Sequence, residues 1–339
     1  THDSAPLVAV AGMGVSLSQT MLGAQKLSEQ GIPTVGGIVT ADEINGARIP
    51  GFVRVEPNDQ EFVASLNNYL KRHTELSSAL VVYDNNADDN TDLYAKSLRD
   101  NLRNGVASRI RLFDPLNFKG VSVPSDANPD LFINITNSIC GVRPNLVLYS
   151  GRQVDLIAFL KSLENRACRE TTPLTVATAG TDLSKLSTPA TMQQLKTGNL
   201  KVVFASSTDA KGWSKGIPNT PAHFVEFRSA FVNRGFDQDD IVDGDAIATH
   251  DAVLTAVKAI RLAYGSALVR NHVTLPHPRD VGSQLLNLNN QSSVVPAAAG
   301  DIRFAFRGGK TGEPINKPIP VLTIPPGEQE NPQDVYVTK

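Results

Sequence analysis

The stretch Ala79-Leu80-Val81-Val82-Tyr83 is an uninterrupted apolar run that ends at Asp84 and leads directly into sequence with helical spacing. Continuous apolar runs of this length are typical of strands covered on both faces by helices, as in parallel α/β sheets. The sequence therefore predicts an α/β protein, in which ligands bind beyond the carboxyl ends of the strands. Four further runs have the same form, at residues 7–11, 34–38, 146–149 and 174–177.

Composition limits the classes of protein to which this chain can belong. Its 339 residues exceed the roughly 150 of an average domain, so two domains are expected. The 32 Lys and Arg residues nearly balance the 34 Asp and Glu residues, without a basic cluster. Binding to nucleic acid needs concentrated positive charge, so the composition argues against a nucleic-acid partner. No apolar stretch approaches the roughly 18 residues of a membrane span, and no signal peptide is visible at Thr1.

Apolar side chains at helical spacing predict helices after the strands. One helix is expected to open at Asn90 or Thr91 and to close at Gly105. Residues 320–324 resemble an edge strand, because they follow a proline-rich segment. A later helix is expected to face the core with Val253, Val257, Ile260 and Tyr264 and to end at Gly265.

Cys140 and Cys168 are the only cysteines of the chain. Cys140 precedes the predicted strand at 146–149 and Cys168 ends the helix that follows, so both fall at the same end of the sheet. A disulfide between them would fit an oxidising, extracytoplasmic compartment. The alternative is two unrelated buried thiols, because sequence does not give the Cα separation that a disulfide requires.

No motif matches a nucleotide, metal or catalytic site. Gly12-Met13-Gly14 lacks the third glycine of a dinucleotide fingerprint, and Ser16 lacks the final glycine of a nucleophile elbow. Residues 84–90 are not an EF-hand, because Asp89 stands at the turn glycine. They form either a solvated, helix-capping loop or part of a polar binding site. The six histidines lack metal-ligand spacing, so the sequence predicts no enzyme, no cofactor and no metal.

Several segments follow one another in a recognisable order. They are Val8-Ala9-Val10-Ala11-Gly12, Gly31-Ile32-Pro33-Thr34-Val35, Phe52-Val53-Arg54-Val55-Glu56-Pro57-Asn58-Asp59, residues 79–84, Leu146-Val147-Leu148-Tyr149-Ser150-Gly151 and Thr249-His250-Asp251-Ala252-Val253. In this order they resemble the type I periplasmic solute-binding proteins of the leucine/isoleucine/valine-binding family, over roughly residues 7–310.

The resemblance implies two Rossmann-like lobes with parallel sheets, joined by a hinge. The expected first lobe is discontinuous, at 1–56 and 240–325, the second covers 57–239, and residues 326–339 form a tail. The family has two further strand-helix units before the segment that matches residue 7. The first lobe is therefore expected to be N-terminally truncated, and its incomplete sheet to promote self-association.

The resemblance also implies where a ligand carboxylate would bind. Ser16 or Ser18, together with Thr40, match the hydroxyl groups that hold it in the family. The helix expected to start at Ser18 would add the favourable field of its amino terminus. The tyrosine that the family places in a later helix is His250 here.

Other positions depart from the family pattern. Asp88 and Arg152 match positions where the family places aromatic residues over the ligand. The acidic residue that pairs with a ligand amine is replaced by Ala179, which leaves Thr181 or Asp182 as substitutes. These departures argue against an aliphatic amino acid. Arg152 would favour an acidic or carbonyl-rich ligand, or else it is a surface arginine at a helix start.

The expected function is that of an extracytoplasmic solute-binding protein of an ABC importer, in the periplasm or anchored at the cell surface as a lipoprotein. It would bind a small polar solute, an amino acid or a related carboxylate or amide, between its lobes by hinge closure and pass it to a membrane permease. The alternative is a sensing or scaffolding domain of a larger cell-surface protein, with a degenerate cleft.

Overall fold

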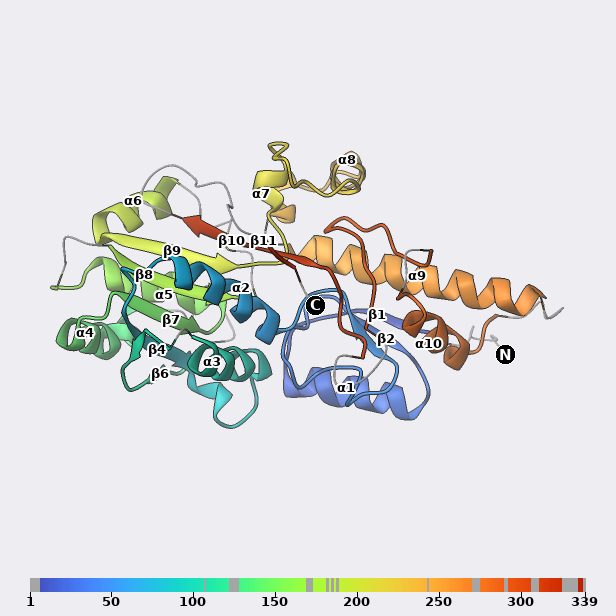
Figure 1. Ribbon diagram of the computed structural model, residues 1–339, viewed down its shortest axis with the longest axis horizontal. Helices are drawn as coiled ribbons and strands as arrows, with labels where there is room; N and C mark the ends of the chain where they lie inside the picture. The colour runs from blue at the N-terminus through green and yellow to red at the C-terminus, as the bar shows by residue number, and fades with distance from the viewer. Residues whose placement is uncertain are drawn as a thin grey trace. The chain divides into compact units, whose positions relative to one another are not determined.

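The structure is a computed structural model that describes residues 7–106, 108–121, 128–168, 173–180, 183, 186, 189–242, 244–269, 275–289, 292–305, 311–324 and 335–337 (Figure 1). The chain forms two compact units. Unit 1 contains Thr1–Asn58, Ala210–Pro318 and Val337–Lys339. Unit 2 contains Asp59–Asp209 and Ile319–Tyr336. Each unit is an α/β domain, as predicted.

Unit 2 contains one eight-stranded sheet in the order β11-β10-β9-β8-β7-β4-β5, with β6 also paired to β4. Strands β4 to β9 pair in parallel, whereas β10 runs antiparallel to β9. The strands are β4 (Ser78–Asp84), β5 (Arg111–Leu112), β6 (Leu116–Phe118), β7 (Leu146–Ser150), β8 (Leu174–Ala179), β9 (Leu200–Ala205), β10 (Pro318–Ile324) and β11 (Val335–Val337).

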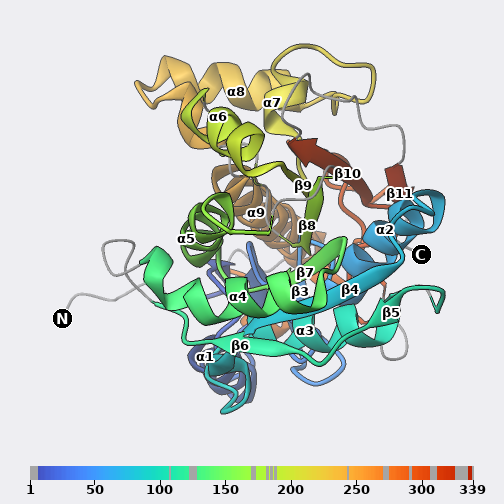
Figure 2. The ribbon, with the colours of Figure 1, turned by 90° about the vertical axis from the view of Figure 1, so that its left-hand side faces the viewer.

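Helices cover both faces of this sheet (Figure 2). In β7, Val147 and Tyr149 join a core cluster with α4, α5 and α6, whereas Leu146 and Leu148 join a second cluster with α2 and α3. Both sets are buried, which explains why the strand sequences are continuously apolar. The helices are α2 (Asp59–Arg72), α3 (Leu93–Gly105), α4 (Ile133–Val142), α5 (Gln153–Glu164) and α6 (Pro189–Gly198), with 3-10 turns η1 (Asn85–Ala87) and η3 (Pro129–Phe132).

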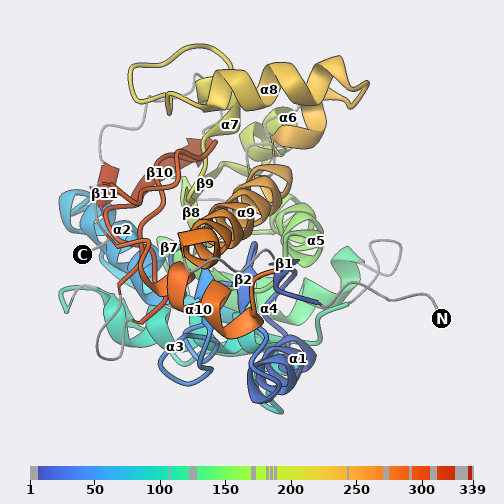
Figure 3. The ribbon, with the colours of Figure 1, turned by 90° about the vertical axis from the view of Figure 1, so that its right-hand side faces the viewer.

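Unit 1 contains a three-stranded parallel sheet in the order β1-β2-β3. The long helix α9 packs alongside β1, β2 and α10 (Figure 3). The strands are β1 (Val10–Met13), β2 (Thr34–Gly36) and β3 (Phe52–Arg54). The helices are α1 (Ser18–Glu29), α7 (Ala210–Trp213), α8 (Phe224–Asn233), α9 (Asp245–Val269) and α10 (Pro278–Leu286), with the 3-10 turn η5 (Gln238–Ile241).

The units divide at different points from the predicted lobes. Residues 210–239, expected in the second lobe, belong to unit 1, because Trp213 and Phe224 share a buried cluster with Ile247 and Ala298. Strand β10 belongs to unit 2 apart from Pro318, because it hydrogen-bonds to β9. It is not the predicted edge strand, since β11 adjoins it on its other side. Among the described helices, none has the length and apolar composition needed to cross a membrane.

Candidate ligand-binding residues

In unit 1, the loops after β1 and β2 are joined by Ser16. Its side chain is buried, and its Oγ accepts hydrogen bonds from the backbone N–H groups of Thr40 (2.9 Å) and Ala41 (3.0 Å). Two of the predicted ligand residues, Ser16 and Thr40, therefore do lie together at the carboxyl edge of this sheet. The hydroxyl of Ser16 is committed as an acceptor to the backbone, so only its proton can be donated to a ligand.

Ser18 has a different environment from Ser16. It is the first residue of α1, and the preceding Leu17, which has no capping side chain, is the N-cap. The Ser18 hydroxyl donates a 3.3 Å hydrogen bond to the side-chain oxygen of Gln19. The helix starts at Ser18 as expected, but the structure does not bring the Ser18 side chain to the Ser16–Thr40 contact.

Arg54 holds the loop around Thr40 through hydrogen bonds. Its side chain is fully buried, and Nη1 donates to the carbonyl oxygens of Val39 (3.1 Å) and Ala41 (3.0 Å), the two neighbours of Thr40. Nη2 donates to the carbonyl of Ile44 and to Glu313, whose Oε1 lies 3.0 Å away. A buried guanidinium that binds several carbonyls fixes the path of the loop, because each acceptor would otherwise be desolvated without a partner.

In unit 2, the corresponding edge of the sheet carries three buried carboxylates. Asp84 ends β4 and accepts hydrogen bonds from the backbone N–H groups of Asn86 (2.9 Å) and Gly120 (3.0 Å). Asp92 caps α3 by accepting from the Ala95 N–H at 3.0 Å. Asp155, in the first turn of α5, has the Val121 N–H at 3.3 and 3.4 Å from its two oxygens.

Arg152 is the cation of this group. Its Nε lies 2.7 Å from Oδ2 of Asp92, and the Arg152 side chain is 27% exposed. Its Nη2 is buried and has no hydrogen-bond partner among the described residues. Arg152 lies at the start of α5, as its alternative interpretation expected, and its side chain is paired with Asp92 on one side and retains a donor on the other.

Burial and mutual repulsion shift the pKa values of these carboxyl groups. Burial, with the negative charge of Asp84, raises the pKa of Asp155 to about 6, against the opposing effect of Arg152. Burial also raises the pKa of Asp92, although Arg152 and the Ala95 N–H counteract it. Burial, reinforced by Asp155, raises the pKa of the Tyr149 phenol well above its usual value. With three carboxylates and one guanidinium, the group carries a net negative charge when all four are ionised.

The remaining predicted residues do not join this group. Asp88 is exposed on the loop after β4, where it pairs with Arg99 at 2.6 Å. Thr181 and Asp182 lie outside the described residues. The sequence interpretation missed Asp92 and Asp155. The capping preference of Asp ahead of an apolar helix is a local signal for Asp92, and the enrichment of acidic residues in the first helical turn is one for Asp155.

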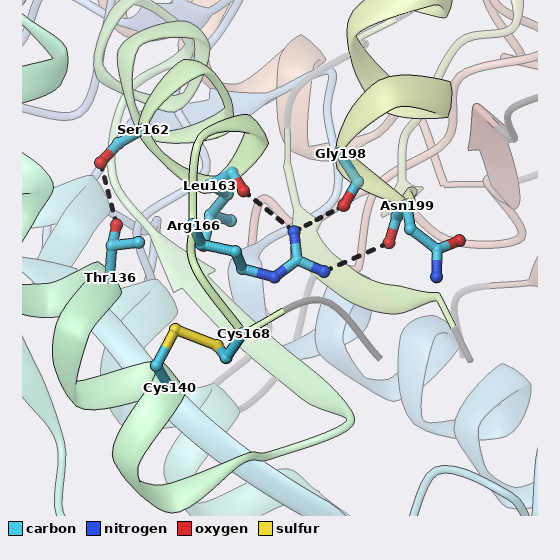
Figure 4. Close-up of a disulfide and its surroundings, with 8 residues drawn as sticks. All are labelled: Thr136, Cys140, Ser162, Leu163, Arg166, Cys168, Gly198 and Asn199. Atoms are coloured by element: carbon cyan, nitrogen blue, oxygen red, sulfur yellow. Dashed lines mark hydrogen bonds between the residues drawn. A yellow bond between two sulfur atoms is a disulfide. The ribbon is translucent and has the colours of Figure 1, made fainter. Parts of the chain in front are cut away.

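The predicted disulfide joins Cys140 of α4 to Cys168, four residues beyond the end of α5, with the Cα atoms 5.2 Å apart (Figure 4). Nearby, Arg166 donates to the carbonyls of Leu163 (2.9 Å) and Gly198 (2.6 Å). These residues lie at the amino-terminal end of strands β7 and β8, so the disulfide is at the opposite end of the sheet from Arg152.

Within the described parts of the chain, no three His, Cys, Asp or Glu side chains are arranged to hold a metal ion. The groups at the strand ends are hydroxyls, carboxylates, one guanidinium and backbone amides. Such groups hydrogen-bond to a small polar molecule and orient it.

Comparison with known proteins defines the fold. No protein-family model and no curated protein matches the sequence. Solved structures do match: a leucine-binding protein of Thermotoga maritima has a TM-score of 0.68 at 12% identity, covering 98% of this chain and 80% of that chain.

A branched-chain amino acid transporter substrate-binding protein of Streptococcus pneumoniae, in complex with isoleucine, has a TM-score of 0.67 at 13% identity. The match covers 97% of this chain and 79% of that chain. A branched-chain amino acid ABC transporter protein of Thermus thermophilus with bound valine has a TM-score of 0.67 at 12% identity. The match covers 96% of this chain and 77% of that chain. The chain thus has the type I periplasmic binding protein fold, as the sequence resemblance predicted.

Proposed function

We propose that this protein is an extracytoplasmic solute-binding protein that delivers a small polar ligand to the permease of an ABC importer. The observation that carries the proposal is the fold: the similar structures from Streptococcus pneumoniae and Thermus thermophilus hold isoleucine and valine. The chemistry of the strand ends supports it, because those groups suit recognition and lack a nucleophile matched with a base. We therefore propose a binding function, which is the function named for the similar structures.

The charges around Arg152 narrow the class of ligand. The unpartnered Nη2 of Arg152 favours a ligand oxygen as hydrogen-bond acceptor. The three carboxylates near Arg152 repel anions, so they disfavour a ligand that carries a second negative charge in addition to one carboxylate. A neutral amide or a zwitterionic amino acid satisfies both conditions better than a dicarboxylate does, so we narrow the predicted ligand to these two classes.

The disulfide supports the proposed location. Disulfides persist in oxidising compartments, so Cys140–Cys168 favours the periplasm or the cell surface. Attachment as a lipoprotein or by another tether, ligand capture by hinge closure, and self-association of the first lobe stay predictions of the resemblance.

A second candidate is a sensing or scaffolding domain of a larger surface protein. It is favoured by Ser16, whose hydroxyl oxygen is occupied by two backbone amides, and by Asp88, which is paired on the surface. If the residues at the expected ligand-binding positions only stabilise the fold, no added solute should raise the stability of the protein.

Thermal unfolding of the full chain, with panels of amino acids, amides, dicarboxylates and sugars, separates the two candidates. A ligand that binds only the native state raises the Tm. The proposal expects a shift with an amide or a zwitterionic amino acid, confirmed by calorimetric titration. No shift across the panels favours the scaffolding function, and a shift with dicarboxylates alone contradicts the charge argument.

Variants of the strand ends then test the site. Arg152→Gln and Thr40→Val should weaken binding by about tenfold or more, the effect of losing one charge-assisted or well-placed hydrogen bond. Exposed residues of the same types provide matched controls: Arg261→Gln in α9 and Thr197→Val in α6 should leave the affinity unchanged. Equal effects of the test and control variants would remove Arg152 and Thr40 from the site.

A further inference from the structure

Unit 1 contains a groove that the proposed function does not use. It has a volume of about 560 Å³ and lies among α8, the loop after it and the first turns of α9. This volume is within the usual range of small-molecule sites, roughly 300–1,000 Å³. The lining residues that matter here are Phe227, Phe231, Arg234, Phe236, Asp245 and His250.

One wall of the groove is aromatic. The Phe231 ring lies 5.7 Å from that of Phe227 and 4.8 Å from that of Phe236, and Phe227 lies 4.7 Å from His250. Phe236 is 54% exposed, although its ring adjoins this buried cluster. An exposed ring that continues an aromatic cluster offers a further ring a place to pack at the same centroid distances.

The other side of the groove is polar and includes one guanidinium, one carboxylate and one imidazole. Arg234 lines it from just beyond α8, and His250 lines it from α9. Asp251 is buried and accepts hydrogen bonds from the backbone N–H groups of Ala298 (2.8 Å) and Ala299 (3.0 Å). Because its carboxylate can only accept, the 2.9 Å contact with His250 is a hydrogen bond donated by Nδ1 of the imidazole. This contact holds the imidazole in one orientation, and the His250 side chain remains 40% exposed.

The amino-terminal turn of α9 adds positive potential to the groove, which Asp245 partly offsets. The Arg234 guanidinium and the helix end favour an anionic group, and the phenylalanines favour a ring. We propose that this groove is a second ligand site, which binds a small aromatic carboxylate with its ring against Phe231 and Phe236 and its carboxylate toward Arg234.

Trp213 provides a reporter for this site. It is the only tryptophan of the sequence, it is buried, and its ring packs edge-on at 5.3 Å against Phe224, in the same cluster as Phe227. Titration of the full chain with 3-phenylpropionate should therefore produce a saturable change in tryptophan fluorescence, with a matching calorimetric affinity. Absence of saturable binding at millimolar concentrations would overturn the proposal.

Two related compounds test the chemistry. 3-Cyclohexylpropionate lacks the aromatic face, and 2-phenylethylamine replaces the carboxylate by a cation. Both should bind about tenfold or more weakly than 3-phenylpropionate. If the amine binds as well as the acid, the proposed role of Arg234 is wrong.

Variants locate the binding. Phe236→Ala and Arg234→Gln should each lower the affinity about tenfold. Val225→Ala, at another exposed position of α8, and Arg261→Gln provide matched controls that should leave it unchanged. Circular dichroism of each variant verifies folding, and a loss of affinity in folded controls equal to that in the test variants would overturn the assignment.

The groove is distinct from the strand-end residues of the proposed function. Arg152→Gln and Thr40→Val should therefore leave 3-phenylpropionate binding unchanged. If either variant abolishes it, the aromatic acid binds at the strand ends and the groove proposal fails, while the proposed function stands. If no solute of the panels binds but 3-phenylpropionate does, the groove proposal stands alone.

Discussion

The guanidinium of Arg152 lies 2.7 Å from Asp92, so that the start of α5 is tied to the cap of α3 across the carboxyl ends of β4 and β7. Neither residue is near the other in sequence. The pair fixes two loops at the edge where ligands of parallel sheets bind. The contribution of this pair to stability can be measured by unfolding, and its contribution to recognition by ligand affinity.

Arg152→Gln is expected to lower the free energy of unfolding by about 1–3 kcal/mol, because it removes the cation that offsets the buried Asp92 and Asp155 carboxylates. Asp92 still caps α3 in this variant, so the loss reports the charge pairing and not the cap. Urea unfolding gives the value. Lys161→Gln, which breaks the exposed Lys161–Glu164 pair, is the control and should cost about 0.5 kcal/mol or less. Equal losses in both variants would contradict the buried character of the Arg152–Asp92 pair.

The strands of unit 2 follow closely from the sequence. The apolar runs at 79–83, 146–149 and 174–177 correspond to β4, β7 and β8, because both faces of these strands are buried and no charged residue interrupts the runs. Strand β1 is observed at Val10–Met13, later than the predicted 7–11. In β3, only three residues long, the buried Arg54 interrupts the apolar pattern that identified the other strands.

Helix α9 shows why spacing alone was misleading. The predicted core stripe included Val253 and Tyr264, which are 46% and 38% exposed. The buried face instead carries alanines, which let the helix approach the sheet closely, and the helix continues through Gly265 to Val269. The sequence pattern assigns the larger apolar side chains to the core, whereas close packing of the helix buries the alanines. The buried alanines are Ala248, Ala252, Ala256, Ala259 and Ala263.

The candidate site was predictable only in part. Ser16, Thr40 and Arg152 lie at strand ends, and their position follows from the order of strands and helices. The grouping of Asp92 and Asp155 around Arg152 depends on the parallel register of β4 with β7, which pairs Val82 with Tyr149. No local pattern encodes that register.

Asp155→Asn is expected to stabilise the protein above about pH 6. The pKa of Asp155 is raised in the folded state, so wild-type stability from this group is present below the unfolded pKa, near 3.8, and is lost as the pH rises through about 6. The variant removes that loss. Its unfolding free energy should exceed that of the wild type by about 1–3 kcal/mol at neutral pH and converge with it near pH 4. A difference independent of pH would exclude ionisation as the cause.

Ser16→Ala is expected to cost about 1–3 kcal/mol, because the N–H groups of Thr40 and Ala41 lose a shared, buried acceptor. Hydrogen exchange should show faster exchange of these two amides. Ser138→Ala, at an exposed position of α4, is the control and should change stability by no more than about 0.5 kcal/mol. Unchanged exchange at residues 40 and 41 would mean that Ser16 does not hold this loop.

Removal of the disulfide by Cys140→Ser and Cys168→Ser together is expected to lower the unfolding free energy by about 3–4 kcal/mol, for a sequence separation of 28 residues. Thiol titration of the unfolded wild type should detect free cysteine only after reduction. Ligand affinity should be unaltered in the folded variant, since the bond lies at the opposite end of the sheet from Arg152. A loss of affinity without a loss of stability would contradict this placement.

Gly46→Ala is expected to destabilise unit 1 by about 3 kcal/mol or more. An added Cβ would lie 2.5 Å from the carbonyl oxygen of Thr311 and 2.6 Å from that of Phe52, and backbone atoms cannot move aside cheaply. Gly14→Ala provides the matched control, because nothing lies within 4 Å of its Cβ. Thermal unfolding of both variants compares them directly. Similar Tm values would show that the loop around Gly46 adapts.

The anchoring of the Thr40 loop by Arg54 has a thermodynamic consequence for recognition. Both carbonyls that flank Thr40 are held by one buried guanidinium, so this segment is ordered before any solute arrives. The conformational entropy of the loop is lost during folding, and binding need not order it again. A solute that contacts Thr40 thus binds to a preorganised surface. Little of its binding free energy is offset by the entropic cost of ordering the loop.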